Sequence, residues 1–186
     1  MLRKLSTSIV AAMMVALFAS SASAQFENQK NYAGVHVGLS GVGSALTLGL
    51  DYERGVTDIG QVGPGIIGIG GIFDYYSYTD NPGGYGGTWT YIDIGVTGMY
   101  HFVLENRKWD PFLGIYIGDE ITSWSWGDQA KAYYASIGYP LPSETSGGIS
   151  VGGSAGIRYF FNDQWAAQAR VGFGFYILAV GVDYKF

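Results

Sequence analysis

The sequence predicts an all-β fold, an eight-stranded antiparallel up-and-down transmembrane β-barrel. Eight segments of about ten residues alternate between apolar residues and small or polar ones, which is the period of a strand with two different faces. Segments of this length cross a bilayer on a tilt, and turn residues separate them. Thirty Gly, fifteen Tyr and five Trp suit a Gly-lined interior and aromatic girdles at the membrane interfaces.

Residues 1–24 are expected to form a signal peptide that is cleaved on export. A basic start precedes a short apolar run over residues 9–18, and an A-x-A cleavage site ends at Ala24. The apolar run is shorter than the roughly 20 residues that a spanning helix needs, which argues against a membrane anchor. No Cys follows the cleavage site, which excludes a lipoprotein anchor. Residues 25–186 are then expected to form one transmembrane β-barrel domain.

Charge and cysteine content exclude two classes of protein. The predicted signal peptide carries two of the ten basic residues and no acidic residue, so the mature chain has a net charge of 8 − 15 = −7. A nucleic-acid-binding domain would show a basic patch, so no nucleic-acid partner is expected. The chain has no Cys, so a disulfide scaffold is excluded and other interactions must hold the fold together.

The predicted strands differ in the quality of their alternation. The third is the poorest, because Ile66 and Ile72 share a face with Asp74, and a bulge is possible there. Residues 77–88 are predicted to be a loop and residues 104–111 a charged turn. The eight predicted strands span residues 32–40, 45–53, 66–76, 89–102, 112–118, 148–160, 165–171 and 178–186.

Barrel closure follows from the membrane environment. Lipid offers no hydrogen-bond partner to a free strand edge, so the last strand must pair with the first. An eight-stranded barrel is just wide enough to be filled by side chains, which argues against a free channel. An even number of strands places both chain ends on one side. The longest segment without a clean strand pattern, residues 119–146, then lies on the other side as a loop.

The closing strand carries the resemblance to a known family. Apolar and aromatic residues alternate along it with Ala179, Gly181, Asp183 and Lys185. The strand ends on an aromatic residue that carries the C-terminal carboxylate. This resembles the last strand of small Gram-negative outer-membrane β-barrels of the OmpA, OmpX and opacity-protein type, over residues 25–186. The resemblance implies a location in the outer membrane, contact with its lipid and lipopolysaccharide, and termini on the periplasmic side. It also implies an assembly signal, read by the barrel-assembly machinery, at Val180, Val182, Tyr184 and Phe186.

Charged and polar residues on the predicted inner faces form a second group. Acidic and basic members nearly balance, so one interpretation is a salt-bridged plug that satisfies buried charges. The alternative is a gate or proton-responsive site, since a histidine can change charge near neutral pH. The expected interior polar network comprises Asp51, Glu53, Asp93, His101, Arg158, Arg170, Asp183 and Lys185.

Catalysis is not expected. Lipid A deacylases of this membrane carry a His-x-Ser motif, whereas His36 is followed by Val-Gly and His101 by Phe-Val. Two isolated histidines are also a poor metal site, and the Gly-x-Gly patterns are not followed by a predicted helix, as a dinucleotide site requires. No cofactor is expected.

Aromatic residues of the segment 119–146 are candidates for contact with a partner. They could anchor an extracellular protein or stack on a glycan, or they could pack on each other or in the lipopolysaccharide headgroup layer. A structural and interaction protein is the first hypothesis. A narrow porin-like channel or transporter for small solutes is the alternative, and a lipid-modifying enzyme comes third. The candidate contact residues are Trp124, Trp126, Tyr133 and Tyr134.

Overall fold

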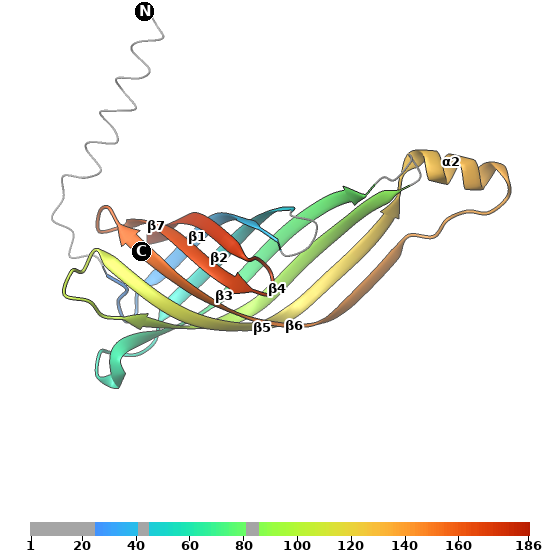
Figure 1. Ribbon diagram of the computed structural model, residues 1–186. Coiled ribbons are helices and arrows are strands. Elements are labelled where there is room, and N and C mark those ends of the chain that lie inside the picture. The colour runs from blue at the N-terminus through green and yellow to red at the C-terminus, as the bar shows by residue number, and fades with distance from the viewer. Residues whose placement is uncertain (1–24, 41–44, 81–85) are drawn as a thin grey trace, which may run out of the picture.

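The computed structural model describes residues 25–40, 45–80 and 86–186, which form a closed barrel of eight antiparallel strands in sequential order (Figure 1). This confirms the predicted fold class. The predicted signal peptide and its cleavage site lie outside the described residues. The elements are β1 (Asn31–Leu39), β2 (Leu46–Gly55), β3 (Gln61–Asp80), β4 (Gly87–Phe102), β5 (Trp109–Trp126), α2 (Asp128–Ser136), β6 (Glu144–Phe160), β7 (Trp165–Phe173) and β8 (Leu178–Lys185).

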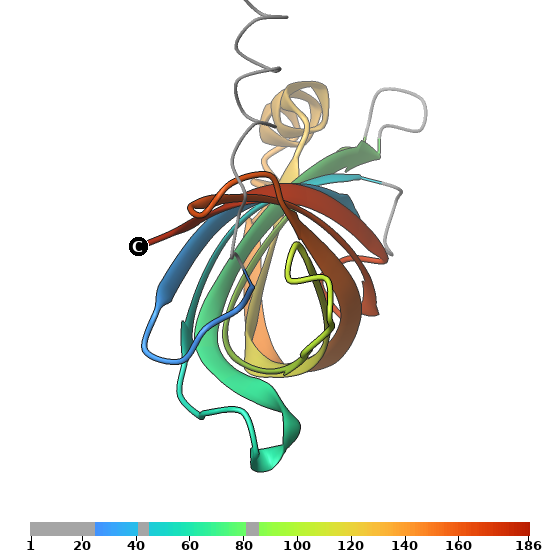
Figure 2. The same ribbon diagram turned by 90° about the vertical axis from the view of Figure 1, so that its left-hand side faces the viewer.

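Pairing of the first strand with the last closes the barrel. β1 and β8 are antiparallel over eight residue pairs, from Tyr32 opposite Lys185 to Leu39 opposite Leu178. The Asn31 N–H donates to the Phe186 carbonyl at 3.0 Å, and the Phe186 N–H donates to the Asn31 carbonyl at 2.9 Å. The view along the barrel shows the resulting ring of strands (Figure 2).

The barrel has two distinct ends. The described chain begins and β8 ends at one end, which we call the near end, and α2 lies at the opposite, far end (Figure 1). Near-end aromatic side chains point outward in pairs, with ring centroids 4.6 Å apart for Trp109 and Tyr159 and 4.9 Å apart for Trp165 and Tyr184. Such a belt is typical of a membrane interface.

Between the two ends, the outer surface is aliphatic. Val35, Leu48, Val96, Ile115 and Val180 are all at least half exposed, as suits side chains that face lipid. In the described part of the chain, no helix is long and apolar enough to cross a membrane.

Four strands extend beyond their predicted ends: β3 by nine residues, β5 by eleven, β6 by four and β4 by two. β3, β4, β5 and β6 have 20, 16, 18 and 17 residues, whereas the other four have 8 to 10. The loop predicted over residues 77–88 is therefore wrong, because residues 77–80 belong to β3 and 87–88 to β4; residues 81–85 of that prediction are not described. Residues 119–126 and 144–146, predicted to be loop, are also strand. Residues 77–79 and 122–126 combine Thr and Ser with Tyr and Trp instead of aliphatic residues, so they lack a hydropathy signal although they favour strands.

Three smaller predictions also differ from the structure. β3 pairs without interruption with both β2 and β4, so the suggested bulge is absent, and Ile66 and Ile72 lie buried inside the barrel. The charged turn predicted over residues 104–111 is shorter, since β5 begins at Trp109. The segment between β5 and β6 contains the helix α2.

A substitution at the C-terminal residue tests the expected assembly signal. Phe186→Ser should reduce assembly of the protein into outer membranes, because it removes the terminal ring that stacks on Tyr184 beside the closing seam. Assembly is measured as the heat-modifiable, membrane-extractable fraction. Phe173→Ser, the same change at an outward position of β7, is the matched control and should assemble normally. Equal assembly of both variants would contradict the prediction.

Candidate functional site

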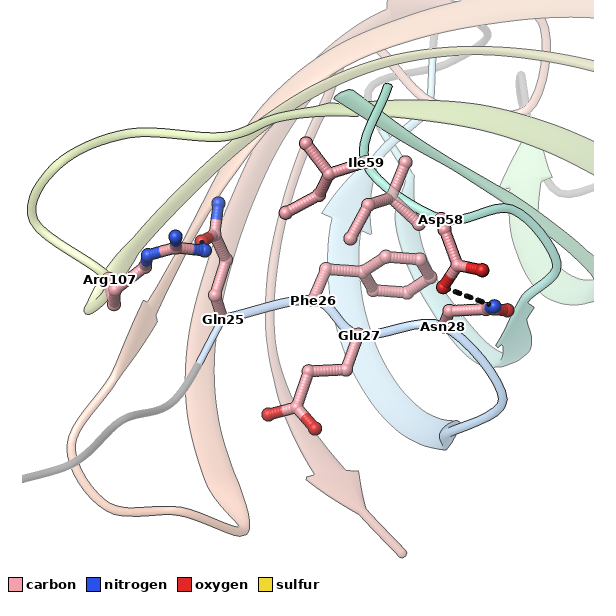
Figure 3. A pocket seen from close by; sticks show the side chains of 8 residues that line it. Gln25, Phe26, Glu27, Asn28, Asp58, Ile59 and Arg107 are labelled. Carbon is pink, nitrogen blue, oxygen red and sulfur yellow. Dashed lines mark hydrogen bonds between the residues drawn. The ribbon is translucent and has the colours of Figure 1, made fainter. Parts of the chain in front are cut away.

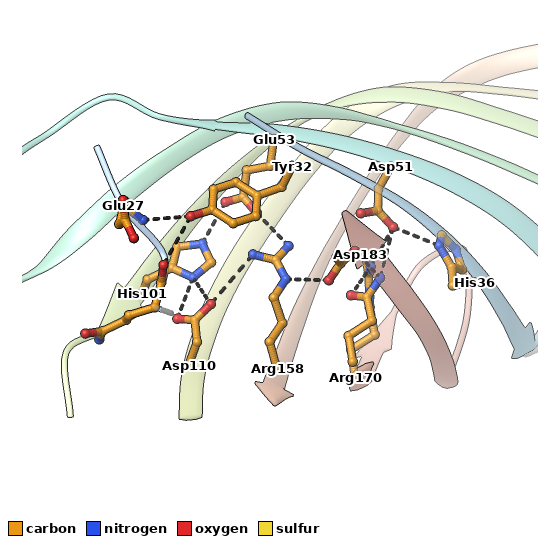
Figure 4. Close-up of polar contacts among 12 residues, drawn as sticks. Glu27, Tyr32, His36, Asp51, Glu53, His101, Asp110, Arg158, Arg170 and Asp183 are labelled. Carbon is orange, nitrogen blue, oxygen red and sulfur yellow. Dashed lines mark hydrogen bonds and ion pairs between the residues drawn. The ribbon is translucent and has the colours of Figure 1, made fainter. Parts of the chain in front are cut away.

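Arg158 of β6 lies buried in the near half of the barrel interior, surrounded by carboxylates. Its Nη2 donates to Glu53 Oε2 of β2 at 2.8 Å, and its Nε donates to Asp183 Oδ2 of β8 at 2.7 Å. Asp110 of β5 lies 3.7 Å from Nη1. Three strands far apart in the sequence thus place acids around one guanidinium (Figure 4). Each buried charge gains the partner that it needs away from water.

His101 of β4 extends this cluster between two acids. Its Nε2 lies 2.7 Å from Glu53 Oε1, and its Nδ1 lies 2.9 Å from Asp110 Oδ1. Asp110 was absent from the predicted network because it falls in a segment that reads as a charged turn. Its position two residues before Phe112, on the alternation of β5, is the signal that could have placed it inside.

Arg170 of β7 is the centre of a second cluster toward the far end. Its Nη2 donates to Asp51 Oδ1 at 2.7 Å and also to the side-chain carbonyl of Gln168. The Gln168 amide donates to Asp183 at 2.9 Å, which joins the two clusters. His36, which lies 3.0 Å from Asp51 and 2.7 Å from Asp74, carries the contacts on to β3. A continuous polar chain therefore runs through the interior (Figure 4).

Inward-facing glycines make room for these side chains. A Cβ at Gly34 would overlap the carboxylates of Asp51 and Asp183, and a Cβ at Gly49 would overlap Asp74 and His36. The high glycine content is therefore tied to the polar interior, where charged side chains cross over the neighbouring backbone.

Apolar side chains close the near end below the polar chain. Phe26 is buried and its ring stacks on the His101 ring with centroids 3.6 Å apart and on the Tyr32 ring at 4.6 Å. The backbone N–H of Glu27 donates to the Tyr32 hydroxyl at 2.9 Å, and that hydroxyl donates to the Gln25 carbonyl. The segment that holds Phe26 also lines a groove of about 610 Å³ at the near end (Figure 3).

The segment between β7 and β8 closes the interior from the far side. Phe175 is buried and stacks on Tyr116 of β5 with ring centroids 3.8 Å apart. Tyr176 lies edge-on to His36, and its hydroxyl accepts a hydrogen bond from Arg170 at 3.3 Å. Burial raises the pKa of the Tyr176 phenol, which keeps it neutral.

The structure brings six of the eight predicted interior residues into this chain and leaves two apart. Asp93 of β4 is buried toward the far end, and neither of its carboxylate oxygens has a hydrogen-bond partner among the described residues. Lys185 lies at the near-end mouth, where its Nζ donates to Glu27 at 3.0 Å. The six joined residues are Asp51, Glu53, His101, Arg158, Arg170 and Asp183.

The predicted contact residues are split between two elements. Trp124 and Trp126 belong to the end of β5 instead of a loop, and their rings lie 5.5 Å apart. Tyr133 and Tyr134 lie in α2, also in contact with each other at 5.4 Å. The structure therefore does not bring all four together in one loop.

The interior geometry is poorly suited to catalysis. Both ring nitrogens of each histidine face carboxylates, so neither ring has a nitrogen directed at a nucleophile. Within the described ranges, no group of three or more His, Cys, Asp or Glu side chains could hold a metal ion.

Comparison with known proteins identifies the class of the fold. No protein-family profile matches the chain, and no curated protein matches it. The N-terminal β-barrel domain of Pseudomonas aeruginosa OprF matches with a TM-score of 0.55 and 14% identity, over 86% of this chain and 98% of that domain. Neisserial surface protein A, NspA, matches with a TM-score of 0.52 and 17% identity, over 84% of this chain and 95% of that one. A de novo designed transmembrane β-barrel matches with a TM-score of 0.50 and 13% identity, over 87% of this chain and 99% of that one.

At these low sequence identities, the structural similarity shows the fold alone. The chain has the fold of the small eight-stranded outer-membrane β-barrels, as the resemblance in the sequence predicted.

Arg158→Ala should cost the protein about 3–5 kcal/mol of unfolding free energy, because it leaves buried carboxylates without their cation. Arg54→Ala is the matched control. Arg54 is exposed and, among the described residues, donates only to Asn31, so its loss should cost about 1 kcal/mol or less. Urea-dependent folding into detergent or lipid vesicles measures both. Equal losses would show that the interior ion pairs do not stabilise the barrel.

Proposed function

We propose that the protein is an outer-membrane β-barrel that acts as a structural and interaction protein, through the part of the barrel that projects outside the cell. The observation that carries this proposal is the unequal length of the strands. β3 to β6 continue well past the ends of the other strands and carry α2 at their tip (Figure 1). We call residues 76–80, 87–92, 121–126 and 144–147, with α2, the extension.

The outward side chains support a position of the extension beyond the hydrocarbon. Along the barrel these side chains are aliphatic, as at Val96 and Ile117. In the extension, beyond the outward pair Ile92 and Ile121, they carry hydroxyls that bond across strands. Thr79 lies 3.1 Å from Thr88, and Ser123 lies 3.3 Å from Thr145. Side chains with hydroxyls suit water or lipid headgroups. The change from aliphatic to hydroxyl-bearing side chains marks the edge of the apolar band toward the far end.

The filled interior favours this function over the alternative of a channel. The polar chain crosses the barrel, and aromatic side chains close it on either side, Phe26 at the near end and Phe175 toward the far end. An eight-stranded barrel leaves little space beyond such side chains. The carboxylate-bound histidines favour a non-catalytic role.

The remaining proposals concern export and surroundings. Residues 1–24 direct export and are removed, and the near end then faces the periplasm. The barrel-assembly machinery reads the closing strand through Val180, Val182, Tyr184 and Phe186. Lipid and lipopolysaccharide surround the mature barrel, and an extracellular partner contacts the extension.

Cysteine labelling of intact cells tests the orientation. The chain has no Cys, so Tyr139→Cys, at a side chain that is 71% exposed beyond α2, introduces a single thiol. A membrane-impermeant maleimide should label this variant in whole cells. Glu105→Cys, at the exposed turn between β4 and β5, should be labelled only after the outer membrane is broken. The reverse pattern would refute the orientation.

Conductance measurements test the closed interior. The purified, refolded protein should give no steady single-channel steps in planar bilayers, because side chains fill the lumen. Heat-modifiable mobility in gels verifies that the sample is folded. Reproducible steps from such a sample would support the porin-like alternative instead.

A further inference from the structure

The inner face of the extension is covered by aromatic rings. Cross-strand neighbours pair Tyr76 with Tyr91, and Trp89 with both Tyr78 and Trp124. Ring centroids are 4.5 Å apart for Tyr76 and Tyr91 and 4.7 Å apart for Trp89 and Trp124. Apart from Tyr76, these rings are only partly buried. We call this surface the aromatic face; its members are Tyr76, Tyr78, Trp89, Tyr91, Trp124 and Trp126.

Carboxylates lie in one row at the base of the aromatic face. Asp74, Asp93 and Glu120 are opposite one another on β3, β4 and β5, in the register directly below Tyr76 and Tyr91. Glu120 accepts a hydrogen bond from Thr122 at 3.3 Å and lines a groove of about 510 Å³ between β5 and β6. Glu144 on β6 lies opposite Trp124, so an acid also flanks the upper part of the face.

Asp93 is an independent indication of a missing partner. Its side chain is fully buried, and both of its oxygens lack a hydrogen-bond partner among the described residues. Asp74 contacts His36 through one oxygen, while its other oxygen has no such partner. Carboxylates opposite each other on neighbouring strands repel, and a buried one without a partner is costly. A cation held above this row would offset both costs.

The charge of the far end indicates that a ligand bound there would be positively charged. Residues 72–96 and 117–150 contain seven carboxylates and one basic residue, Lys131. Lys131 lies on α2 and donates to Ser125, on the opposite face of β5 from Trp124. This surface therefore repels anions and concentrates cations.

We propose that the aromatic face and the acidic row form a binding site for a small organic cation, an alkylated ammonium group. Partly exposed Trp and Tyr rings attract such a cation through their faces, Glu120 supplies a carboxylate at their base, and Asp93 and Asp74 lie beside it in the same row. The rings exclude water from the alkyl groups, which a metal ion would not need. The inference rests on the proposed function in one respect, since the site must be open to the outside.

Choline is the probe for this site, with 3,3-dimethyl-1-butanol as its uncharged counterpart of the same shape. Binding is measured by calorimetry and by Trp fluorescence on the refolded full chain in a maltoside detergent. Phosphocholine detergents are avoided because their headgroups carry the same cation. Choline should bind saturably and at least about tenfold more tightly than the alcohol. Equal affinities, or no saturable binding of choline, would overturn the proposal.

Two substitutions with the same change of charge locate the site on one face of β5. Glu120→Gln should weaken choline binding about tenfold or more. Asp119→Asn, the neighbouring residue on the outer face, should leave it unchanged. Trp124→Leu should also weaken it, because a flat ring is lost from the face. Equal weakening by Glu120→Gln and Asp119→Asn would mean a diffuse charge effect and would overturn the proposal.

The fold of each variant is checked by heat-modifiable mobility. Binding in detergent does not depend on the orientation of the barrel in the cell, whereas labelling at Tyr139→Cys depends on orientation alone. Failure of the binding site and failure of the proposed function are therefore distinguishable.

Discussion

The hydrogen bonds between β1 and β8 are the constraint on which the rest of the structure depends. Lipid cannot satisfy a free strand edge, so the sheet is stable in a membrane only when it is closed. Closure with eight strands fixes a narrow interior, and the strand alternation then directs one face of every strand into it. Side chains that would be harmless on a water-facing sheet, such as Glu53 and Arg158, are thereby forced into contact.

The interior resolves this crowding by pairing charges and removing side-chain volume. Arg158 and Arg170 each contact acids from other strands, and Gln168 links the two clusters through Asp183. Inward glycines such as Gly34 and Gly49 leave space where a Cβ would overlap these groups. Paired and hydrogen-bonded charges in a buried interior make it rigid and specific.

The extension differs in its side-chain chemistry from the rest of the barrel. Beyond the aliphatic band its outer face carries hydroxyls, and its inner face carries rings above the row of Asp74, Asp93 and Glu120. In the barrel, acids face arginines; at the base of the aromatic face, Asp93 has no such partner among the described residues. This contrast within one continuous sheet separates the part of the chain that holds the fold from the part that we propose for recognition.

The sequence by itself determined the number, order and facing of the strands, because a period of two is local information that survives without any contact. It determined the inward position of Arg158 and Asp183 for the same reason. It did not determine the ends of β3 to β6, since Thr, Ser, Tyr and Trp alternate there without an aliphatic signal and tertiary pairing between the strands extends them. Nor did it determine which charges meet. Strand register and barrel stagger bring Asp110 against His101. They also place Asp93 away from the basic side chains that the other acids contact. These are properties of the closed sheet that no single segment encodes.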